Sequence, residues 1–398
     1  MQRIYMDANA TTPLAEEVFE AMRPYWMDAF ANASSIHQDG QRAHRAVTEA
    51  REAVAALLGC REAEVVFNSG GTEGDNTALF GLLRPGDHLI TTSIEHSAIL
   101  QAAERLQQKG VEVSFVDPLP NGAMDPEAIR AALRANTRLI SVMLANNETG
   151  VLQPVEEIGK IAAEAGIYFH MDAVQGAGKV TLDVKRFGCH LLSVSAHKMY
   201  GPKGVGALYV RRGTPLEAQI VGGSHERRRR AGTENVPGIV GMGKAAELAA
   251  KSLADGTQQR LAGLRDRLES GLRKIAETRI NPDQDMPEQH TPEQSAESKA
   301  VARVSNTTNV LFAGVESEAL LIALDLKGIA ASGGSACHSG STRPSHVLLA
   351  MGLNEQDARS SLRLSLLKTA TEADVERLLA VLPDAVSQLR ALGTSARA

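Results

Sequence analysis

The sequence has 398 residues, and 43% of them are hydrophobic, which is enough to bury the core of one large domain and a smaller companion. The 42 basic and 47 acidic residues give a formal net charge of -5, which offers no general attraction to nucleic acid or to an anionic membrane surface. No apolar run reaches the length of a membrane span and no signal-peptide pattern is present, so we expect a cytoplasmic protein without a membrane partner.

Short apolar runs alternate with longer amphipathic stretches from about residue 15 to residue 210. This alternation predicts an α/β fold, in which a mostly parallel sheet is flanked by helices on both faces. The predicted strands are residues 64–69, 88–93, 111–116, 138–145, 166–173 and 190–196.

The second half of the chain predicts a smaller α+β domain. A long helical pattern covers residues 238–277, and strands and helices mix from residue 306 onward. Between them, residues 281–300 are rich in Pro, Gln and Glu and are predicted to form a mobile surface insertion. We therefore expect a large domain over residues 16–258 and a small domain formed by residues 1–15 and 259–398.

Polar residues follow the predicted strands at the points where these strands end. In a doubly wound sheet these points meet at one edge, where ligands bind. The sequence Gly-Pro-Lys-Gly after one of the strands forms a tight turn just beyond a lysine. The residues that should converge there are Gly71, Thr72, His96, Asn147, Asp172, Gln175, Ser195, His197 and Lys198.

Each of these residues also has an ordinary structural interpretation when it is taken alone. The Gly-Gly-Thr turn can be a simple helix start, Asp172 can cap a helix, and Lys198 can be an exposed lysine. Residues 238–245 match a P-loop up to its lysine, but Ala245 stands where Ser or Thr should bind magnesium, and no strand precedes the motif. The glycines there are better explained by close helix packing.

The converging set as a whole fits pyridoxal phosphate. That cofactor needs a lysine amine for its aldehyde and a carboxylate for its pyridine nitrogen, which Lys198 and Asp172 can supply. Its phosphate needs backbone N–H groups at a helix N-terminus together with hydroxyl and imidazole groups. The candidates for the phosphate are Gly71, Thr72, Ser195 and His197.

Over nearly its whole length, the sequence resembles the cysteine desulfurases, the NifS-type enzymes of the class V aminotransferase-like pyridoxal phosphate group. The motifs that carry the resemblance, in chain order, are "YMDANATT", "SGGTEGDN", "EHSAIL", "ANNETG", "HMDAVQ", "SAHKMYGPKGVGALYV", "RRAGTEN", "SGGSACHSGS" and "SSLRLSL". The resemblance implies the fold of the fold-type I pyridoxal phosphate transferases.

The resemblance also implies a role for each matched residue. Lys198 would carry the cofactor, Asp172 would pair with the pyridine nitrogen, and His96 would stack on the ring. Asn147 and Gln175 would reach the ring oxygen or the substrate. Gly71, Thr72, Ser195 and His197 would hold the phosphate, and Thr233 would reach the phosphate of a neighbouring subunit, which implies a homodimer.

Cys337 is the candidate nucleophile among three cysteines that are too few and too scattered for a disulfide framework or a zinc site. Its neighbours are small and polar, which is typical of an exposed thiol on a movable loop. Cys189 begins an apolar run and is expected to be buried and inert, and Cys60 ends a predicted helix. The resemblance implies that Cys337 receives the sulfur.

Arg363 lies in the alternating sequence "SSLRLSL", which predicts a strand with one apolar and one polar face. The pattern alone leaves two interpretations open, a solvent-facing edge strand or a guanidinium that binds a substrate carboxylate. In the family that the sequence resembles, an arginine in this motif binds the substrate carboxylate, which implies the same role for Arg363.

The implied reaction converts L-cysteine to L-alanine and leaves a persulfide on Cys337. Lys198 would remove the Cα proton, Arg363 and Asn147 would hold the carboxylate, and His96 would exchange protons with the ring oxygen or the substrate thiol. An iron–sulfur scaffold or another acceptor protein would then take the sulfur. One alternative is another pyridoxal phosphate enzyme of this fold, which would keep Lys198 and Asp172 but would not use Cys337. The other is a non-catalytic scaffold that uses the fold only for partner binding.

The sequence departs from the family pattern in the insertion near residues 281–300, which is longer than usual, and in two further places. "ANASS" at residues 31–35 replaces the usual Gly-Asn-Pro-Ser-Ser, and Thr342 and Arg343 stand where Leu and Glu are common. The last of these departures adds positive charge near Cys337 and leaves the identity of the acceptor open.

Overall fold

The computed structural model describes residues 3–282, 301–333 and 344–395. Within these residues, the larger sheet has the strand order β2-β8-β7-β6-β5-β3-β4. Its strands are β2 (Val65–Asn68), β3 (His88–Thr92), β4 (Glu112–Val116), β5 (Thr137–Ser141), β6 (Tyr168–Asp172), β7 (Leu191–Ser195) and β8 (Gly206–Val210). Only β8 runs antiparallel to its neighbours, so the predicted α/β fold with a mostly parallel sheet is confirmed.

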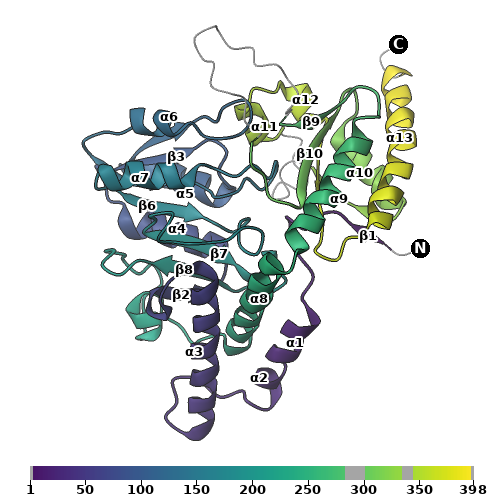
Figure 1. Ribbon diagram of the computed structural model, residues 1–398. Helices are drawn as coiled ribbons and strands as arrows, with labels where there is room; N and C mark the ends of the chain where they lie inside the picture. The colour runs from purple at the N-terminus through teal and green to yellow at the C-terminus, as the bar shows by residue number, and fades with distance from the viewer. Residues whose placement is uncertain (1–2, 283–300, 334–343, 396–398) are drawn as a thin grey trace.

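Helices cover both faces of the larger sheet because successive strand residues point to opposite sides. Phe67, Ile90 and Leu192 belong to one apolar core together with helices α3 (Gln38–Leu58), α7 (Val155–Glu164) and α8 (Val236–Ala254). Their sequence neighbours Val66, Leu89 and Leu191 belong to a second core with α4 (Gly71–Leu82) and α5 (Ser97–Gln107). Figure 1 shows the sheet between these two layers. The remaining helix beside this sheet is α6 (Pro126–Ala131).

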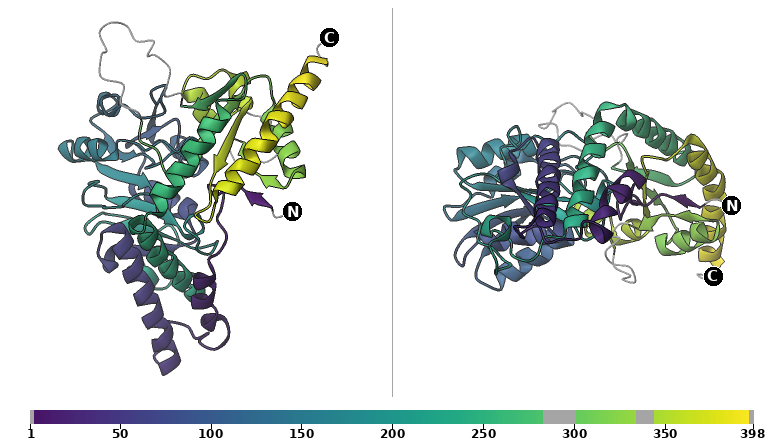
Figure 2. Two further views of the ribbon diagram at one scale, coloured as in Figure 1. Left: turned by 45° about the vertical axis from the view of Figure 1, so that its right-hand side comes forward. Right: turned by 90° about the horizontal axis from the view of Figure 1, so that it is seen from below.

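A smaller antiparallel sheet has the order β12-β13-β10-β9. Its strands are β9 (Thr278–Asn281), β10 (Thr307–Phe312), β12 (Ser332–Gly333) and β13 (Ser361–Ser365), and beside it β1 (Ile4–Tyr5) pairs in parallel with β11 (Ile329–Ala330). Helices α9 (Thr257–Leu272), α10 (Ser317–Leu326) and α13 (Glu372–Ser395) contribute to the apolar core of this part, whereas the buried residues of α11 (His346–Ala350) and α12 (Glu355–Arg359) belong to a core of the larger sheet. The two views of Figure 2 show this part beside the larger sheet.

The boundaries differ from the predictions in two places. The predicted helix over residues 238–277 is two helices, because the chain turns at Asp255 and at Gly256, whose φ is 84°. The predicted insertion begins later than residue 281, because Asn281 ends β9, where its amide donates to Asn309 and Ser361. The rest of that prediction, residues 283–300, lies outside the described residues.

The apolar cores divide the chain near the predicted domain boundary. The core of the smaller sheet contains Ile4 and Met6 and then residues between Leu261 and Val386, except that Val347, Leu348, Met351 and Ala358 belong to the core of the larger sheet. The exact domain limits stay a prediction.

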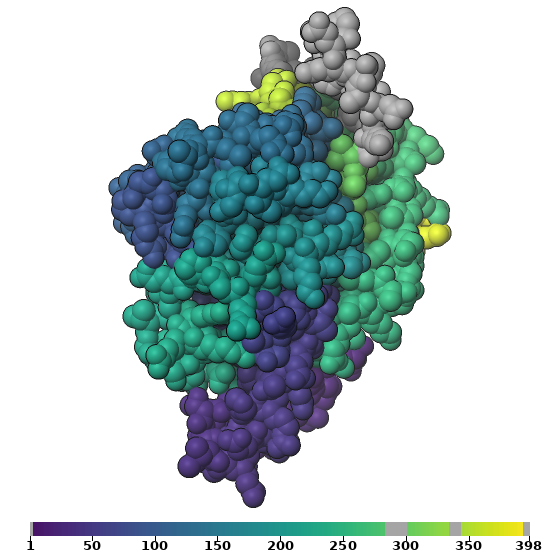
Figure 3. All heavy atoms as spheres, turned by 60° about the vertical axis from the view of Figure 1, so that its left-hand side comes forward, coloured from purple at the N-terminus to yellow at the C-terminus, as the bar shows by residue number. Residues whose placement is uncertain are grey.

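At the other end of the molecule, α3 projects beyond the larger sheet together with the short helices α1 (Glu16–Met22) and α2 (Pro24–Met27), as the purple segments in Figures 2 and 3 show.

A buried ion pair fixes the loop that leads into α8. Glu226 has a left-handed backbone (φ 46°), and its carboxylate accepts two hydrogen bonds of 2.7 Å from Arg51 of α3. The Phe67 backbone N–H donates to the same carboxylate at 2.9 Å, and Arg51 also donates to the Val65 carbonyl at 2.8 Å. The loop is therefore held against β2 by a pair whose side chains are 9% and 4% exposed.

Arg51→Ala should lower the free energy of unfolding by about 3–5 kcal/mol, because it leaves the buried Glu226 carboxylate without its cation. Arg130→Ala is the control, since Arg130 pairs with Glu127 and Glu164 at the surface and should cost at most about 1 kcal/mol. Urea denaturation followed by circular dichroism measures both changes. Equal losses for the two variants would contradict the assignment.

Candidate functional site

One cavity of about 350 Å³ lies at the edge where the predicted strand-end residues meet. Of the predicted residues that the structure describes, all except Thr233 line it, namely Gly71, Thr72, His96, Asn147, Asp172, Gln175, Ser195, His197, Lys198 and Arg363. Thr233 is exposed in the loop before α8 and is not among the lining residues. Cys337, Thr342 and Arg343 lie outside the described residues.

Lys198 is presented by a single turn of 3-10 helix, Ala196–Lys198, directly after β7. Its Nζ donates to the backbone carbonyls of Asn9 at 2.5 Å and Ala10 at 2.7 Å. The following turn is tight, because a Cβ on Gly201 would lie 2.8 Å from the Cβ of Ala196. The amine is thus held at the cavity by the N-terminal segment of the chain.

The N-terminus of α4 forms one end of the cavity. Its N-cap, Gly70, has φ 148° and offers no side chain to the first N–H groups of the helix. A Cβ on Gly71 would lie 2.6 Å from Val174 Cγ2, so only glycine fits this approach. His197 is hydrogen bonded through Nδ1 to Thr11 at 3.1 Å, and burial together with the Lys198 and Lys203 charges lowers its pKa to about 4.

Asp172 ends β6 and is 7% exposed. Its Oδ1 accepts a hydrogen bond of 2.9 Å from the Val174 backbone N–H. Burial raises the pKa of the Asp172 carboxyl, and the nearby His96 and Lys198 oppose this rise. The site therefore suits a ligand that brings a cationic N–H donor to this carboxylate.

His96 is the N-cap of α5, and its Nδ1 accepts a hydrogen bond of 3.1 Å from the Ala98 backbone N–H. Because Nδ1 is the acceptor, a neutral His96 ring carries its proton on Nε2. The loop before α5 thus aims a defined tautomer at the cavity.

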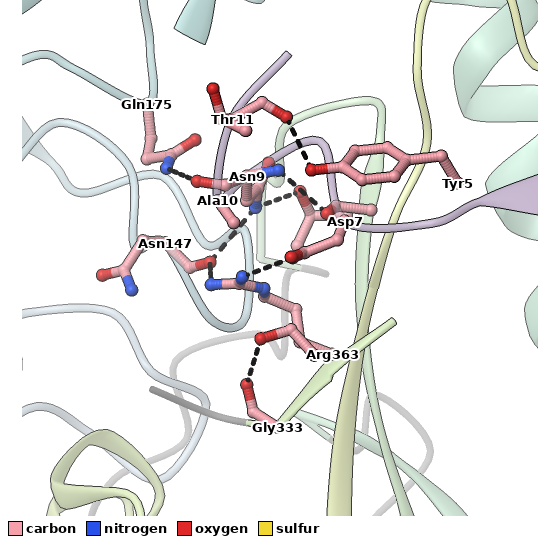
Figure 4. Close-up of polar contacts among 12 residues, drawn as sticks. Tyr5, Asp7, Asn9, Ala10, Thr11, Asn147, Gln175, Gly333 and Arg363 are labelled. Atoms are coloured by element: carbon pink, nitrogen blue, oxygen red, sulfur yellow. Dashed lines mark hydrogen bonds and ion pairs between the residues drawn. The ribbon is translucent and has the colours of Figure 1, made fainter. Parts of the chain in front are cut away.

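Residues near the N-terminus organise the site, which the sequence analysis missed. The Asn9 side chain donates to the Asn147 carbonyl at 3.1 Å and to Thr307 at 2.9 Å. Its backbone carbonyl accepts from Gln175 at 2.9 Å as well as from Lys198. Figure 4 shows Asn9 between Gln175 and Asn147. Asp7 and Asn9 lie in the motif "YMDANATT". The resemblance to the family includes this motif but implied no role for either residue.

Arg363 is buried, with 1% of its side chain exposed, and it joins the two sheets. Its Nη2 donates to Asp7 at 2.8 Å and its Nη1 donates to the Asn147 carbonyl at 3.2 Å (Figure 4). Its Nε has no hydrogen-bond partner among the described residues. This donor is therefore available to an acceptor that enters the cavity.

The interpretation of the Arg363 strand as a solvent-facing edge is wrong. β13 lies between β12 and β10, and all of its residues are buried. Its polar face is covered by other polar groups, since Ser365 accepts from the Asn9 N–H and Ser361 accepts from Asn281. The alternation in the sequence marks the wall of a site and not a surface.

Lys179 is a second amine close to Lys198, and the sequence analysis did not identify it. Its Nζ donates to Gln175 Oε1 at 2.7 Å and to Asn9 Oδ1 at 2.8 Å. Burial, followed by the charges of Lys198 and Arg363, lowers the pKa of Lys179 well below its usual value. Lys179 thereby fixes the orientation of the Gln175 amide.

Buried acids form another part of the wall that the sequence did not reveal. Glu148 lines the cavity and accepts a hydrogen bond of 2.5 Å from Ser345, the N-cap of α11. The next residue, His346, also lines the cavity and is hydrogen bonded through Nε2 to the Glu95 carbonyl at 3.0 Å. The start of α11 is therefore tied to the segments that follow β3 and β5.

The two described cysteines are poor nucleophiles. Burial is the largest cause that raises the pKa of Cys60 and of Cys189 to about 12 in each case. Cys189 is fully buried before β7, as predicted. Neither thiol would ionise near neutral pH.

Comparison with known proteins gives the same assignment as the motifs. The family model described as "Aminotransferase class-V" matches residues 4–378. The chain belongs to this family. Class-V aminotransferases depend on pyridoxal phosphate as a family, which agrees with the chemistry of the cavity.

The similar proteins are cysteine desulfurases. Cysteine desulfurase IscS of Methanosarcina thermophila is 47% identical over 391 residues, which are 97% of this chain and 93% of that protein. A cysteine desulfurase of Trichormus azollae is 46% identical over 396 residues, which are 98% of this chain and 95% of that protein.

Solved structures agree. A NifS-like protein from Rickettsia africae has a TM-score of 0.84 and 32% identity, with 97% of this chain and 100% of that chain covered. SspA in complex with cysteine has a TM-score of 0.76 and 36% identity, with 91% and 98% covered. The resemblance to the cysteine desulfurases is therefore confirmed.

Within the described residues, no helix is long and apolar enough to cross a membrane. In the same part of the chain, no group of three or more His, Cys, Asp or Glu side chains could hold a metal ion.

Glu95 gives a test of the buried acids. Its Oε1 accepts hydrogen bonds from Thr92 and the Met143 N–H, Oε2 has no partner among the described residues, and burial raises its pKa to about 8. The pKa of Glu95 is higher in the folded protein than in the unfolded chain, so protonated Glu95 favours the folded state. The contribution of Glu95 to the free energy of unfolding is therefore complete below about pH 4.5 and is lost as the pH rises through about 8.

Glu95→Gln keeps the accepting oxygen and cannot ionise, so it should remove this loss. Relative to the wild type, the free energy of unfolding of the variant should rise by up to about 1.4 kcal/mol per pH unit between pH 5 and pH 8. Denaturation at several pH values measures the gain, with Glu104→Gln on the exposed side of α5 as control. A Glu95→Gln curve parallel to the wild-type curve would show that Glu95 is ionised in the folded protein.

Proposed function

We propose that the protein is a cysteine desulfurase that uses pyridoxal phosphate to transfer sulfur from L-cysteine to its own Cys337. The observation that carries the proposal is one cavity that joins an amine, a buried carboxylate and a helix N-terminus without a side-chain cap. These are Lys198, Asp172 and the start of α4. The family assignment supports the same activity.

The residues of the cavity fit the cofactor. The N-cap Gly70 has no side chain to occupy the first N–H groups of α4, which leaves them open to a phosphate, and Ser195 and His197 also line the cavity. Asp172 offers a carboxylate whose burial would be offset by a protonated pyridine nitrogen. When bound, the cofactor supplies an aldehyde for covalent attachment and a ring that acidifies the substrate Cα–H.

Lys198 holds the cofactor and then moves the Cα proton. In the structure its amine lies against two backbone carbonyls, which accept its protons and keep it at the cavity wall. Release from the cofactor would leave it placed as a general base. His96 would exchange a proton with the substrate thiol or the ring oxygen through Nε2.

Arg363 binds the substrate α-carboxylate. Its Nε is a buried donor without a partner among the described residues, and a carboxylate oxygen would satisfy it. Asp7 and the Asn147 carbonyl hold the other two nitrogens, so the guanidinium cannot rotate away. The Asn147 side chain would complete the carboxylate site.

Cys337 accepts the sulfur. Its thiolate attacks the sulfur of the bound substrate, a sulfur–sulfur bond forms, and the bond from Cβ to sulfur breaks with its electron pair moving toward Cβ. Protonation of Cβ and Cα then gives L-alanine, and the persulfide stays on Cys337. An iron–sulfur scaffold or another acceptor protein would take this sulfur.

A homodimer would complete the cofactor site. Thr233 is exposed and does not line the cavity of its own chain. In the proposed assembly it reaches the phosphate in the neighbouring subunit.

Lys198→Ala should abolish covalent attachment of the cofactor, because its amine is the one at the aldehyde position. Borohydride reduction followed by peptide mass spectrometry measures this attachment. Lys179→Ala is the matched control, since Lys179 is the neighbouring amine and should leave the modification on Lys198 intact. A modified Lys179 peptide in the Lys198→Ala variant would contradict the assignment of Lys198 as the attachment site.

Cys337→Ser should bind L-cysteine but form neither L-alanine nor a protein persulfide, because a serine hydroxyl cannot take the sulfur at neutral pH. Alanine and sulfide assays with L-cysteine, together with mass spectrometry of the protein, measure the products. Cys60→Ser is the control and should keep the wild-type rate. Sulfide release at the wild-type rate from Cys337→Ser would make the enzyme a lyase that eliminates sulfur directly.

A further inference from the structure

Asp75 is a buried acid of the cavity for which the proposed mechanism has no role. It lies in the first turns of α4 with 1% of its surface exposed, and it lines the same cavity as Asp172. Its Oδ1 has no hydrogen-bond partner among the described residues. An unpaired carboxylate oxygen at such depth is costly, and a bound proton removes most of that cost.

A chain of hydrogen bonds leads from Asp75 through the larger sheet. His170, which is fully buried, lies on β6 and faces the same side as Asp172 two residues later. Its Nδ1 is hydrogen bonded to Ser141 at 2.9 Å and its Nε2 to Ser193 at 3.1 Å. Asp75 Oδ1 lies 3.5 Å from His170 Nε2, and hydrogen bonding from the Ser193 hydroxyl acts to lower the pKa of Asp75.

This chain can run in two directions, and each direction matches one charge state of Asp75. With Asp75 ionised, Ser193 donates to Asp75, His170 donates through Nε2 to Ser193, and Ser141 donates to Nδ1. With Asp75 protonated, the acid donates to Ser193, Ser193 donates to Nε2, and Nδ1 donates to Ser141. The tautomer of His170 therefore reports the proton on Asp75.

Electrostatics favours the protonated acid. The charged and titratable groups that face Asp75 are Asp172 and His170 on β6 and Glu95 before α5. Burial lowers the pKa of His170 to about 3, so this ring is neutral and cannot compensate a charge on Asp75. Burial, followed by the Asp172 charge, raises the pKa of Asp75 well above its usual value.

Asp172 has cations that Asp75 lacks. His96 and Lys198 both act on the Asp172 carboxylate, whereas no cation is among the groups that act most strongly on Asp75. When two carboxyl groups in one buried site cannot both ionise, the one with cationic neighbours keeps the charge.

We propose that Asp75 is a positioning residue that stays protonated beneath Asp172, so that Asp172 alone presents a negative charge to the ring of the bound cofactor. The His170 chain holds this proton in place. The consequence for the ring rests on the proposed function, but the proton on Asp75 does not.

The cofactor-free protein tests the proton directly. Histidine labelled with ¹³C and ¹⁵N distinguishes the two neutral tautomers of His170, and His170→Gln identifies its signals among the 11 histidines. The expected result at pH 7 is the Nδ1–H tautomer. The Nε2–H tautomer at pH 7 would overturn the proposal. If His170→Gln does not fold, Ser141→Ala identifies the signals by shifting them.

The bound cofactor gives an independent measurement through its dissociation constant, determined by fluorescence titration. Asp75→Asn stays neutral and keeps the shape, so it should change the dissociation constant by less than about threefold, which corresponds to under 1 kcal/mol. Asp172→Asn, the same substitution on the ionised neighbour, should weaken binding more than about tenfold. A similar tenfold loss in Asp75→Asn would show that Asp75 carries a charge and would overturn the proposal.

The two measurements separate the two proposals. Failure of both the wild type and Asp172→Asn to bind the cofactor would contradict the proposed function, and the His170 tautomer would still decide the state of Asp75. If Asp75→Asn does not fold, wild-type spectra over a pH range take its place, since the proposal requires the Nδ1–H tautomer of His170 at every pH from acidic to neutral, and a change to Nε2–H within that range would overturn it.

Discussion

The site depends on residues 7–12 lying between the two sheets. Asn9 and Ala10 hold the Lys198 amine with their carbonyls, and Asp7 binds Arg363, which comes from the smaller sheet. The Thr12 N–H and hydroxyl both donate to the His197 carbonyl at 3.0 Å. The amine and the guanidinium are thus placed by one short segment, so the distance between them is fixed by the chain itself and not by a hinge between the sheets.

The cavity concentrates acids and cations where water is scarce. Burial raises the pKa of Glu95, Glu148 and Asp172, and it lowers the pKa of Lys179. Burial therefore weakens ionisation for groups of both signs, and the charges that remain belong to groups with opposite charges nearby, such as Arg363 with Asp7 and Asp172 with His96 and Lys198. A ligand with a carboxylate and a cationic ring nitrogen would meet these remaining charges at defined points.

Local pattern was enough to find the residues that follow parallel strands, such as Asp172 and Lys198, because the sheet brings the ends of its strands together. It was also enough for the α/β fold. It could not assign a role to Asp7, whose partner Arg363 lies 356 positions away, since such a pair leaves no periodic signal. The break between α8 and α9 was visible as the dipeptide Asp255-Gly256, a turn signal that the helical period outweighed.

The loop before α8 is tied to the end of the cavity that α4 forms. Arg230 of this loop binds Glu73 of α4 through hydrogen bonds of 2.9 and 3.3 Å, and Glu73 follows Thr72, which lines the cavity. Three residues after Arg230, Thr233 is exposed and points the loop toward a neighbour in the proposed homodimer. Because Glu226 of the same loop is paired with Arg51, the loop that carries Thr233 is held to α3 as well as to α4.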